Sequence, residues 1–362
     1  MNCYAIFRNS LFRIRKGAIS MRQFEGYLKG INLGGWLSQC GKKYNEEHYS
    51  TFITKKDIDL IASWGLDHVR LPVDYNVVQN EDGTFIESGF RHIDDCIAWC
   101  EANNLKMVLD LHKTCGFVFD NKNYCNFFTE RKLQDMFIDL WMEFTRRYGA
   151  NENIAFELLN EVTDAAMADP WNLISAETIA AIRTLAPKKK IIIGGIYNSS
   201  IYGLTLLTQP ADENIVFTFH CYSPMIFTHQ AAGWIEQMPR NYHMTYPLPA
   251  SKVRSESFNV FGADYDGEFG SLGDDMMSAE YFRRLFTTAV SVAEKYNVPM
   301  YCGEYGVIDS ADLDSTLAWY KDIHTALDEL HLARAAWSYK QMDFGISDER
   351  NKDILDKLIS NL

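Results

Sequence analysis

Residues 151–162 read NENIAFELLNEV, and this stretch decides the fold. Its apolar residues are Ile154, Ala155, Phe156, Leu158 and Leu159. Such a short run without polar alternation is typical of a strand that is buried on both faces. The run stops at Asn160 and Glu161, and the carboxyl end of a strand is where a parallel barrel presents its chemistry. The stretch therefore predicts a parallel α/β fold in which Glu161 is a catalytic acid/base.

Seven further apolar runs are also expected to form strands. They are Tyr27–Asn32, His68–Pro72, Lys106–His112, Lys190–Gly194, Ile215–His220, Pro299–Gly303 and Ala333–Trp337. With Ile154–Asn160 they make eight, and helical spacing of apolar residues separates them, as in Phe90, Ile93, Ile97 and Cys100. Strand and helix alternating eight times predict a (β/α)8 barrel. An open doubly wound sheet is the alternative, but no GxGxxG follows the first strand.

One interval between strands is much longer than the others. It runs from Ile215 to Pro299, and its excess lies in residues 221–277, which contain several prolines and aromatic residues. A structureless loop of that length is uncommon inside a domain. We therefore predict an inserted subdomain at about 221–277, between strand 6 and helix 6, on the face that carries the active site. The alternative is a packing appendage that does not touch the substrate.

Composition narrows the class of protein. The chain has 362 residues and a net charge of −13, and this negative charge argues against nucleic acid as a partner. It contains no run of about 20 apolar residues, which argues against a membrane-spanning segment. The eight cysteines form no CxxC pair, so zinc and redox motifs are absent. Residues 1–20 lack the apolar core of a secretory signal and are treated as an extension without an assigned role. Residues 21–362 are predicted to be one catalytic domain of a cytoplasmic, monomeric protein.

The predicted strands end in residues that could carry chemistry. These residues are Arg70, His112, Asn160, Glu161, His220, Tyr222, Glu304 and Trp337. Two carboxylates across a cleft suit glycoside hydrolysis, in which one protonates the leaving oxygen while the other attacks the anomeric carbon or activates water. The two histidines could instead bind a metal, but no HxH pair is present. We therefore predict neither a metal nor another cofactor.

Several motifs are similar to those of a known family. They are GINLGGWLSQ (30–39), DHVRLPVDY (67–75), AFELLNEV (155–162), FHCYSPMIFTHQ (219–230), YCGEYGV (301–307) and WSYKQMDFG (337–345). The chain resembles glycoside hydrolase family 5 of clan A, the retaining (β/α)8 glycosidases, and within it the clostridial-type cellulase branch with an insertion after strand 6. The similarity extends from about Lys29 to about Phe344.

The resemblance implies a role for each residue at a strand end. Glu161 would be the acid/base and Glu304 the nucleophile. Arg70 and Tyr222 would hold Glu304, and His220 would support Glu161. The residues expected to contact sugar at the cleavage point are His112, Asn160 and Trp337. Outer subsites could include Trp36, Phe117, Phe119, His229, Trp234, Lys340 and Asp343.

The predicted activity is hydrolysis of β-1,4-glucan, mainly at internal bonds, by double displacement through a glycosyl ester of Glu304. Exo action, β-1,3 or mixed-linkage glucan and β-mannan remain alternatives within the same chemistry. A non-catalytic glycan-binding barrel and a metal-dependent barrel hydrolase or isomerase are alternatives of other classes. Glu157 is predicted to be a buried structural acid, because it lies four residues before Glu161, deeper in the barrel.

Overall fold

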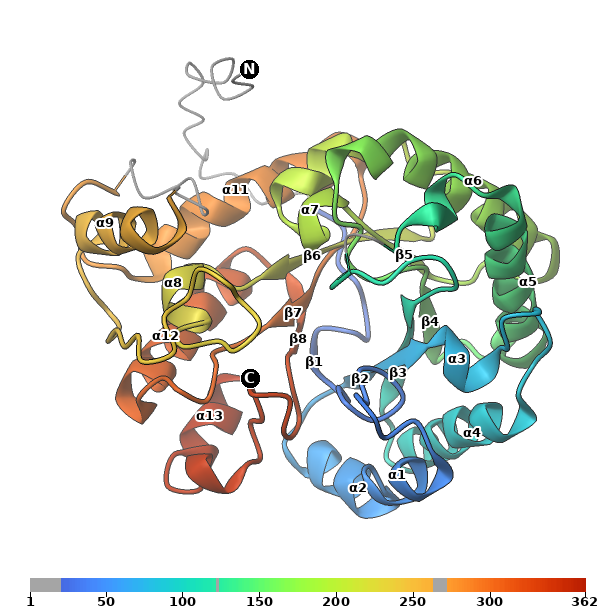
Figure 1. The fold of residues 1–362 in the computed structure, drawn as a ribbon, viewed down its shortest axis with the longest axis horizontal. Coiled ribbons are helices and arrows are strands. Elements are labelled where there is room, and N and C mark those ends of the chain that lie inside the picture. Colours follow the sequence, from blue (N-terminus) through green and yellow to red (C-terminus); the bar gives the residue numbers. More distant parts are fainter. Residues whose placement is uncertain (1–20, 122–123, 263–271) are drawn as a thin grey trace.

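The computed structural model describes residues 21–121, 124–262 and 272–362. The predicted extension 1–20 and residues 263–271 of the predicted insertion lie outside the described residues. Eight parallel strands pair in chain order, and the first pairs with the last, which closes the barrel (Figure 1). The predicted (β/α)8 architecture, a TIM barrel, is confirmed.

Each predicted strand is present. Their bounds are β1 Lys29–Asn32, β2 His68–Asp74, β3 Lys106–Lys113, β4 Ile154–Glu157, β5 Ile191–Gly194, β6 Ile215–Cys221, β7 Met300–Tyr305 and β8 Ala333–Ala336. The prediction that β4 continues to Asn160 is wrong. The backbone N–H groups of Leu158 and Asn160 still donate to β5 and β3, but Glu161 has a φ of 41°, so the chain leaves the extended conformation there.

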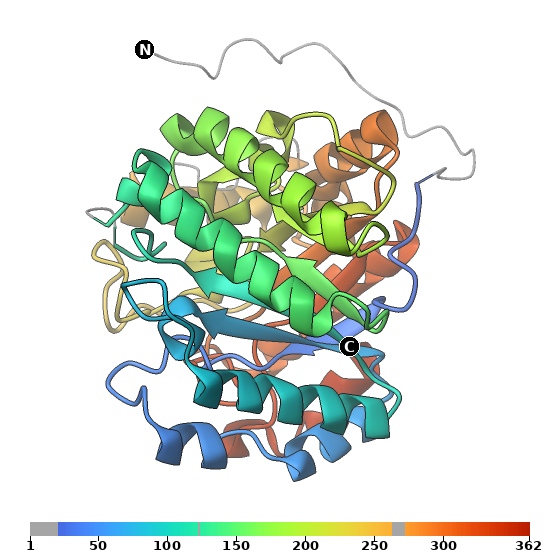
Figure 2. The same ribbon diagram turned by 90° about the vertical axis from the view of Figure 1, so that its right-hand side faces the viewer.

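Helices surround the strands and cover their outer faces (Figure 2). The longer ones are α2 Lys55–Ser63, α4 Glu87–Ala102, α5 Arg131–Tyr148, α6 Ala168–Leu185, α11 Ala279–Tyr296 and α12 Leu313–Glu329. Shorter ones are α1 Glu46–Thr51, α3 Tyr75–Val78, α7 Ile196–Ser199, α8 Met225–Thr228, α9 Ala250–Phe261, α13 Leu355–Asn361 and the 3-10 turns η2 Asn126–Phe128, η3 Ala165–Met167, η4 Tyr202–Leu206 and η5 Glu349–Asn351. Within the described part of the chain, no helix combines the length and apolar character that crossing a membrane requires.

The outer layer is anchored by apolar stripes on the helices. In α5 the buried residues include Leu133, Phe137, Leu140 and Phe144, three or four positions apart, as the sequence predicts. After β5 the connection consists of two short elements, α7 and η4, in place of a long helix. This short connection keeps the chain close to the barrel mouth next to β4 and β6.

A second apolar cluster closes the amino end of the barrel. It comprises Phe24, Tyr27, Val108, Ala155, Ile192, Val216, Tyr301, Ala333 and Ala335. These strand residues point into the barrel, and the rings of Phe24 and Tyr27, stacked 4.4 Å apart, come from the segment before β1. Because the amino end is filled in this way, the polar interior residues lie toward the carboxyl ends of the strands.

The segment between β6 and α11 leaves the regular pattern. It contains α8 and α9, and it packs onto the unit formed by β7 and α12. The Tyr246 backbone N–H donates to Ser315 Oγ at 2.8 Å, and the Tyr246 hydroxyl donates to Asp322 at 2.8 Å. The described part of the segment is therefore tied to the barrel through specific contacts.

Candidate active site

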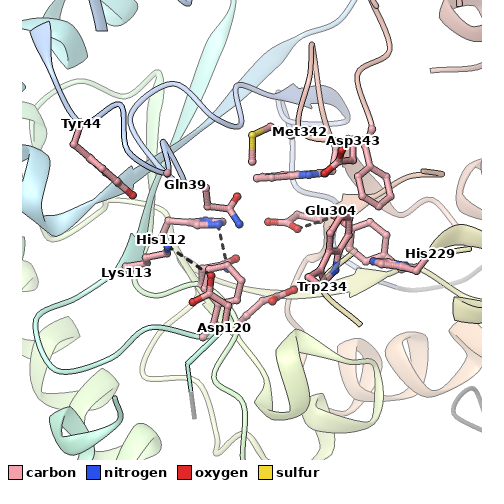
Figure 3. Close-up of a pocket in the computed structure, with 17 residues that line it drawn as sticks. Gln39, Tyr44, His112, Lys113, Asp120, His229, Trp234, Glu304, Met342 and Asp343 are labelled. Carbon is pink, nitrogen blue, oxygen red and sulfur yellow. Dashed lines mark hydrogen bonds and ion pairs between the residues drawn. The ribbon is translucent and has the colours of Figure 1, made fainter. Parts of the chain in front are cut away.

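A cavity at the carboxyl ends of the strands collects most of the predicted site residues. Its volume is about 560 Å³, within the range of small-ligand pockets. The predicted residues that line it are His112, Asn160, Glu161, Tyr222, Glu304 and Trp337. Figure 3 shows Glu304 between His112 and Lys113 on one side and His229 and Trp234 on the other. Residues from distant parts of the chain thus meet in one site.

Glu161 and Glu304 approach each other closely. One carboxylate oxygen of each lies within 4.8 Å of the other and of a ring nitrogen of His220. Carboxyl groups ~5–5.5 Å apart are typical of retaining glycosidases, whereas inverting enzymes separate them by ~6.5–9.5 Å to admit a water molecule. The short separation fits direct attack by one carboxylate on the sugar.

Glu304 is surrounded by hydrogen-bond donors. Arg70 Nη1 donates to Oε1 at 2.7 Å, and the Tyr222 hydroxyl donates to Oε2 at 2.9 Å. His220 Nδ1 lies 3.6 Å from Oε2. Donors of this kind stabilise a carboxylate and fix its orientation. The arrangement holds Glu304 in one position with its charge partly balanced.

Glu161 has a different set of partners. His220 Nδ1 lies 2.8 Å from Oε1, and Asn198 Nδ2 donates to Oε2 at 3.3 Å. Neither partner is a permanent cation, in contrast to the Arg70 guanidinium at Glu304. The φ of 41° at Glu161 is rare for a residue with a side chain, and such strain concentrates at functional sites.

Arg70 is fully buried and contacts three carboxylates. Its Nε and Nη2 donate to both oxygens of Glu157 at 2.8 and 2.9 Å, Nη1 donates to Glu304, and Nη2 lies 3.0 Å from Asp110. The prediction of Glu157 as a buried acid with a partner is confirmed. One guanidinium therefore faces more negative charge than it can neutralise when all three acids are ionised.

Asp110 and Asn32 are site-supporting residues that the sequence reasoning missed. Asp110 Oδ2 accepts a hydrogen bond from His112 Nδ1 at 2.7 Å, which orients the ring toward the cavity. Asn32 Oδ1 accepts from Arg70 Nη1 at 2.9 Å. A signal existed for Asp110, because it lies two residues before His112 on the same strand face and a charged residue inside an apolar strand requires a partner.

Burial shifts the proton affinities of the acids. It raises the pKa of Glu161 to about 7, against the opposing effects of Asn198 and Arg70. Burial also raises the pKa of Glu304, which His220 and Arg70 oppose. The pKa of Asp110 is raised by burial to about 7 although Arg70 opposes this. Glu161 can therefore carry a proton near neutral pH, as a general acid must.

The two histidines remain neutral proton carriers in this environment. Burial lowers the pKa of His220, with Arg70 adding to the effect and Glu304 opposing it. Burial likewise lowers the pKa of His112 well below its usual value. A neutral His220 whose Nδ1 carries the hydrogen donates to Glu161 without adding a positive charge. A neutral ring favours the ionised carboxylate less than an imidazolium would, so burial still keeps the pKa of Glu161 raised.

Aromatic side chains form the walls of the cavity. The Trp337 ring stacks on His112 with a centroid distance of 5.7 Å and an interplanar angle of 7°. Trp234 lies beside His229 and Phe344, and 56% of its surface is exposed. Flat apolar faces of this kind suit the apolar face of a pyranose ring.

The outer-subsite candidates divide into two groups. Phe119, His229, Trp234 and Asp343 line the cavity. Trp36, Phe117 and Lys340 do not line it. Trp36 is fully buried and donates through Nε1 to Tyr49 O, and Phe117 is buried in the main core. Lys340 forms an ion pair with Asp57 at 2.9 Å and does not line the cavity.

Further lining residues come from the end of β3 and from the loops after β1, β3 and β8, and they were not predicted. They are Gln39, Gly41 and Tyr44 after β1, Lys113 at the end of β3, Asp120 after β3, and Met342 and Phe344 after β8. Lys113 Nζ lies 3.9 Å from Asp120, so an ion pair borders the cavity on this side (Figure 3). Polar loop residues give no sequence signal that separates a cavity wall from a solvated surface.

The atoms of Glu161, His220 and Glu304 that approach within 4.8 Å could in principle hold a cation. Their existing partners fit that role poorly. Arg70 and Tyr222 already donate to the two oxygens of Glu304, and His220 Nδ1 faces Glu161. A cation would have to displace these donors or sit next to the guanidinium charge. The arrangement suits proton transfer better than metal binding.

Comparison with protein families gives a match over most of the chain. The model of the cellulase family, glycosyl hydrolase family 5, matches residues 28–343. Cellodextrinase A of Ruminococcus flavefaciens is 42% identical over 316 residues, which cover 87% of this chain and 86% of that protein. Endoglucanase C of Acetivibrio thermocellus is 38% identical over 336 residues, covering 92% and 97%.

Solved structures give the same fold. The cellulose synthase subunit Z of Clostridioides difficile superposes with a TM-score of 0.72 at 25% identity, covering 93% of this chain and 99% of that one. The endoglucanase Cel5A of Thermotoga maritima superposes with a TM-score of 0.72 at 24% identity over 93% and 97%. At this identity the second likeness supports the fold alone.

Proposed function

The chain belongs to glycoside hydrolase family 5, and on that premise we propose that Glu161 is its general acid/base and Glu304 its nucleophile. The enzyme is a β-1,4-glucanase that hydrolyses cellulosic glucans with retention of configuration. The observation that carries the assignment is the short separation of the two carboxylates combined with their unlike partners. Arg70 and Tyr222 donate to Glu304, whereas Glu161 meets His220 and Asn198.

The first chemical step forms a glycosyl-enzyme ester. A Glu304 oxygen attacks the anomeric carbon while the bond to the leaving oxygen breaks, and that oxygen takes the proton of Glu161. The raised pKa of Glu161, about 7, provides this proton near neutral pH. Arg70 loses part of its ionic partner as Glu304 becomes an ester, but Glu157 and Asp110 still balance its charge. The guanidinium therefore stays in place through the cycle.

The second step reverses the proton's direction. Glu161, now ionised, takes a proton from a water molecule as the water oxygen attacks the anomeric carbon, and the ester bond to Glu304 breaks. The sugar leaves with its original configuration because two inversions have occurred. His220 supports both steps, because its Nδ1 lies 2.8 Å from Glu161 and 3.6 Å from Glu304. It can stabilise whichever carboxylate carries the charge.

We propose that His112, Asn160 and Trp337 position the sugar at the cleavage point. Asn160 Oδ1 accepts from Arg70 at 3.0 Å, so its amide orientation is fixed, and Asn160 Nδ2 lies 3.4 Å from His112 Nε2. Both side chains can bind hydroxyl groups of the sugar. The Trp337 ring, parallel to His112, offers an apolar face to the pyranose. Hydrogen bonds that strengthen in the transition state would supply several kcal/mol of catalysis.

We also propose that the segment at about 221–277 is an insertion that shapes the cleft within a single catalytic domain of residues 21–362. His229 and Trp234 of this segment line the cavity and pack against Phe344. An exposed tryptophan at the rim favours contact with a glucan chain over a purely structural role. Cleavage at internal bonds, the mode expected here, requires that this wall leave the cleft open at both ends.

Covalent trapping tests the nucleophile directly. An activated 2-fluoro cellobioside should inactivate the enzyme and add one fluoroglycosyl group to the peptide that contains Glu304, as read by mass spectrometry. Glu304→Ala should neither react nor turn over. Glu161→Gln should still form the ester with an activated aryl leaving group but lose activity on unactivated glucan. Labelling at another residue, or turnover by Glu304→Ala, would show the assignment to be wrong.

Product patterns test linkage and mode of action. Carboxymethylcellulose, barley glucan, laminarin and mannan should be compared under identical conditions. The proposal expects hydrolysis of the β-1,4 substrates and an early loss of viscosity relative to reducing ends. Release of only one short product without loss of viscosity would indicate exo action. Faster cleavage of laminarin or mannan would overturn the β-1,4 preference.

A further inference from the structure

The loop after β5 contacts the acid/base region twice. The Asn198 backbone N–H donates to Val162 O at 3.0 Å, and the Asn198 side chain donates through Nδ2 to Glu161 Oε2 at 3.3 Å. The other Glu161 oxygen is occupied by His220. Asn198 therefore meets the carboxyl oxygen that His220 leaves open, and it is anchored to the neighbouring backbone at the same time.

The backbone of this loop is specialised. Tyr197, Asn198 and Ser199 have φ values of 56°, 56° and 52°, a run of three residues with side chains in the left-handed region. Left-handed backbone is unfavourable for most residues with a side chain, and asparagine is among those that tolerate it best. Strain of this kind persists only where surrounding structure enforces it, and it clusters at functional sites.

Two glycines allow the backbone on either side of this turn to pack closely. A Cβ on Gly195 would lie 2.5 Å from the carbonyl carbon of Gly203, and a Cβ on Gly203 would lie 2.0 Å from Ile196 O. The loop thus folds tightly onto itself across α7, next to the barrel mouth (Figure 1). Ser199 is buried beneath it, whereas Tyr197 and Asn198 are exposed. The exposed amide at the tip is held by a rigid support.

We propose that Asn198 is a positioning residue for the Glu161 carboxyl group: the left-handed turn 197–199 presses its amide against Oε2 and fixes the direction in which the proton is delivered. The inference rests on the proposed function, because it assigns Glu161 the proton transfer. An amide suits this place in both halves of the cycle. Its N–H donates to the ionised carboxylate, and after rotation its oxygen accepts from the protonated acid.

The charged and titratable groups around Glu161 set the direction of the expected effect. They are His220 and Tyr222 from the β6 strand and loop, Glu304 from β7, Arg70 from β2, and Asp110 and Asp120 from the β3 strand and loop. Asn198 is neutral and donates to the ionised form of Glu161, so it lowers the pKa of that carboxyl against the effect of burial. Its removal should therefore move the pKa of Glu161 upward.

Glycine is the informative substitution because it separates backbone from side chain. Asn198→Gly keeps the left-handed conformation, which glycine adopts freely, and removes only the amide. Asn297→Gly is the matched control, since Asn297 has the same conformation, with φ 51° and ψ 47°, at the end of α11. Asn198→Ala adds backbone strain to the loss of the amide. The difference in activity between the two Asn198 variants shows how much the left-handed backbone contributes apart from the amide.

The measurement is the pH profile of kcat/KM on cello-oligosaccharide and on an aryl cellobioside with a good leaving group. Asn198→Gly should lose about tenfold on the first substrate and less than about twofold on the second. Its alkaline limb should move to higher pH by at least about half a unit, while Asn297→Gly matches the wild type. Equal losses on both substrates with an unmoved limb would overturn the inference and leave the hydrolase assignment intact.

A titration of the Glu161 carboxyl keeps the test independent of activity. Isotope-edited infrared spectra of ¹³C-glutamate-labelled wild-type protein, Asn198→Gly and Glu161→Gln identify the Glu161 signal by its loss in the last variant. The signal should titrate at higher pH in Asn198→Gly. Identical titrations in the wild type and Asn198→Gly would refute the contact. Absence of hydrolysis by the wild type would instead refute the proposed function.

Discussion

Replacement of the acid/base by its amide should stabilise the fold, and only above acidic pH. Burial raises the pKa of Glu161 from 4.5 to about 7. The folded protein therefore binds this proton more tightly than the unfolded chain does, so the wild type loses stability as the pH rises from about 4.5 to about 7. Glu161→Gln carries no charge to bury, and it escapes this loss.

The expected gain in unfolding free energy follows from the raised pKa of Glu161. A difference of about 2.5 pKa units between the folded and the unfolded chain corresponds to up to about 3.5 kcal/mol at about 1.4 kcal/mol per unit. The Glu161 side chain is only 14% exposed, so solvent screening reduces this little. In Glu161→Gln the new amide oxygen can still accept from His220, although one new N–H must find a partner. A gain of about 2 kcal/mol at pH 8 is therefore the realistic expectation.

Urea unfolding followed by circular dichroism at pH 4.5 and pH 8 measures the unfolding free energy of Glu161→Gln and of the wild type. The difference in unfolding free energy between Glu161→Gln and the wild type should be near zero at the lower pH and about 2 kcal/mol in favour of the variant at the higher. Glu213→Gln, at an exposed position, controls for the substitution itself. A constant difference at both pH values, or a variant that is less stable at pH 8, would refute the reasoning.

Four further outcomes are expected. Arg70→Lys should cost about 3–5 kcal/mol in urea unfolding and more than 100-fold in kcat/KM, because a compact ammonium cannot reach three carboxylates at once; a loss below tenfold would contradict this. In the wild type, kcat/KM on unactivated glucan should fall about tenfold per pH unit above pH 7 as Glu161 loses its proton, whereas an unchanged rate at pH 9 would exclude it as the acid. Trp234→Ala should raise KM for long cello-oligosaccharides by about 10-fold and leave cleavage of a short aryl glycoside unchanged; equal effects on both would place Trp234 outside the substrate path. Activity should be the same after dialysis against EDTA, and recovery only with a divalent cation would show that the cluster around His220 binds metal.

The fold could be predicted from sequence because each strand is a short apolar run between turn residues. The same pattern brought His112 and Glu304 to the cavity, since polar residues near the carboxyl end of such a run lie toward the barrel mouth, whereas Arg70 lies inside β2 and holds Glu304 from within the barrel. The end of β4 was less predictable. Leu158 and Leu159 continue the apolar run, and nothing in their side chains indicates the left-handed turn at Glu161.

The outer walls of the cavity could not be predicted for a physical reason. Trp36 and Phe119 are both aromatic residues in loops after strands, yet the first packs into the core and the second lines the cavity. Whether such a residue enters the core or lines the cavity depends on the path of its loop, which the residue type does not reveal. Lys340 illustrates the same point, because its partner Asp57 lies on α2, 283 residues earlier in the chain. Neither position reveals the pair by itself.

The interior of the barrel takes part in the chemistry through its charge balance. Arg70 faces Asp110, Glu157 and Glu304, so full ionisation would leave two uncompensated negative charges inside the barrel. Removal from water disfavours that state, and the pKa values of all three acids are accordingly raised.

The same excess of negative charge affects Glu161. The charge of Glu161 raises the pKa of both Asp110 and Glu304, and because charge repulsion is mutual, their charges raise the pKa of Glu161 as well. Glu157 does not touch the substrate, but it shares the Arg70 guanidinium with the nucleophile Glu304. It therefore influences how much of the charge of Glu304 Arg70 can balance. The barrel needs an arginine at position 70 because its fork of five donors can divide among these acids and still hold Glu304.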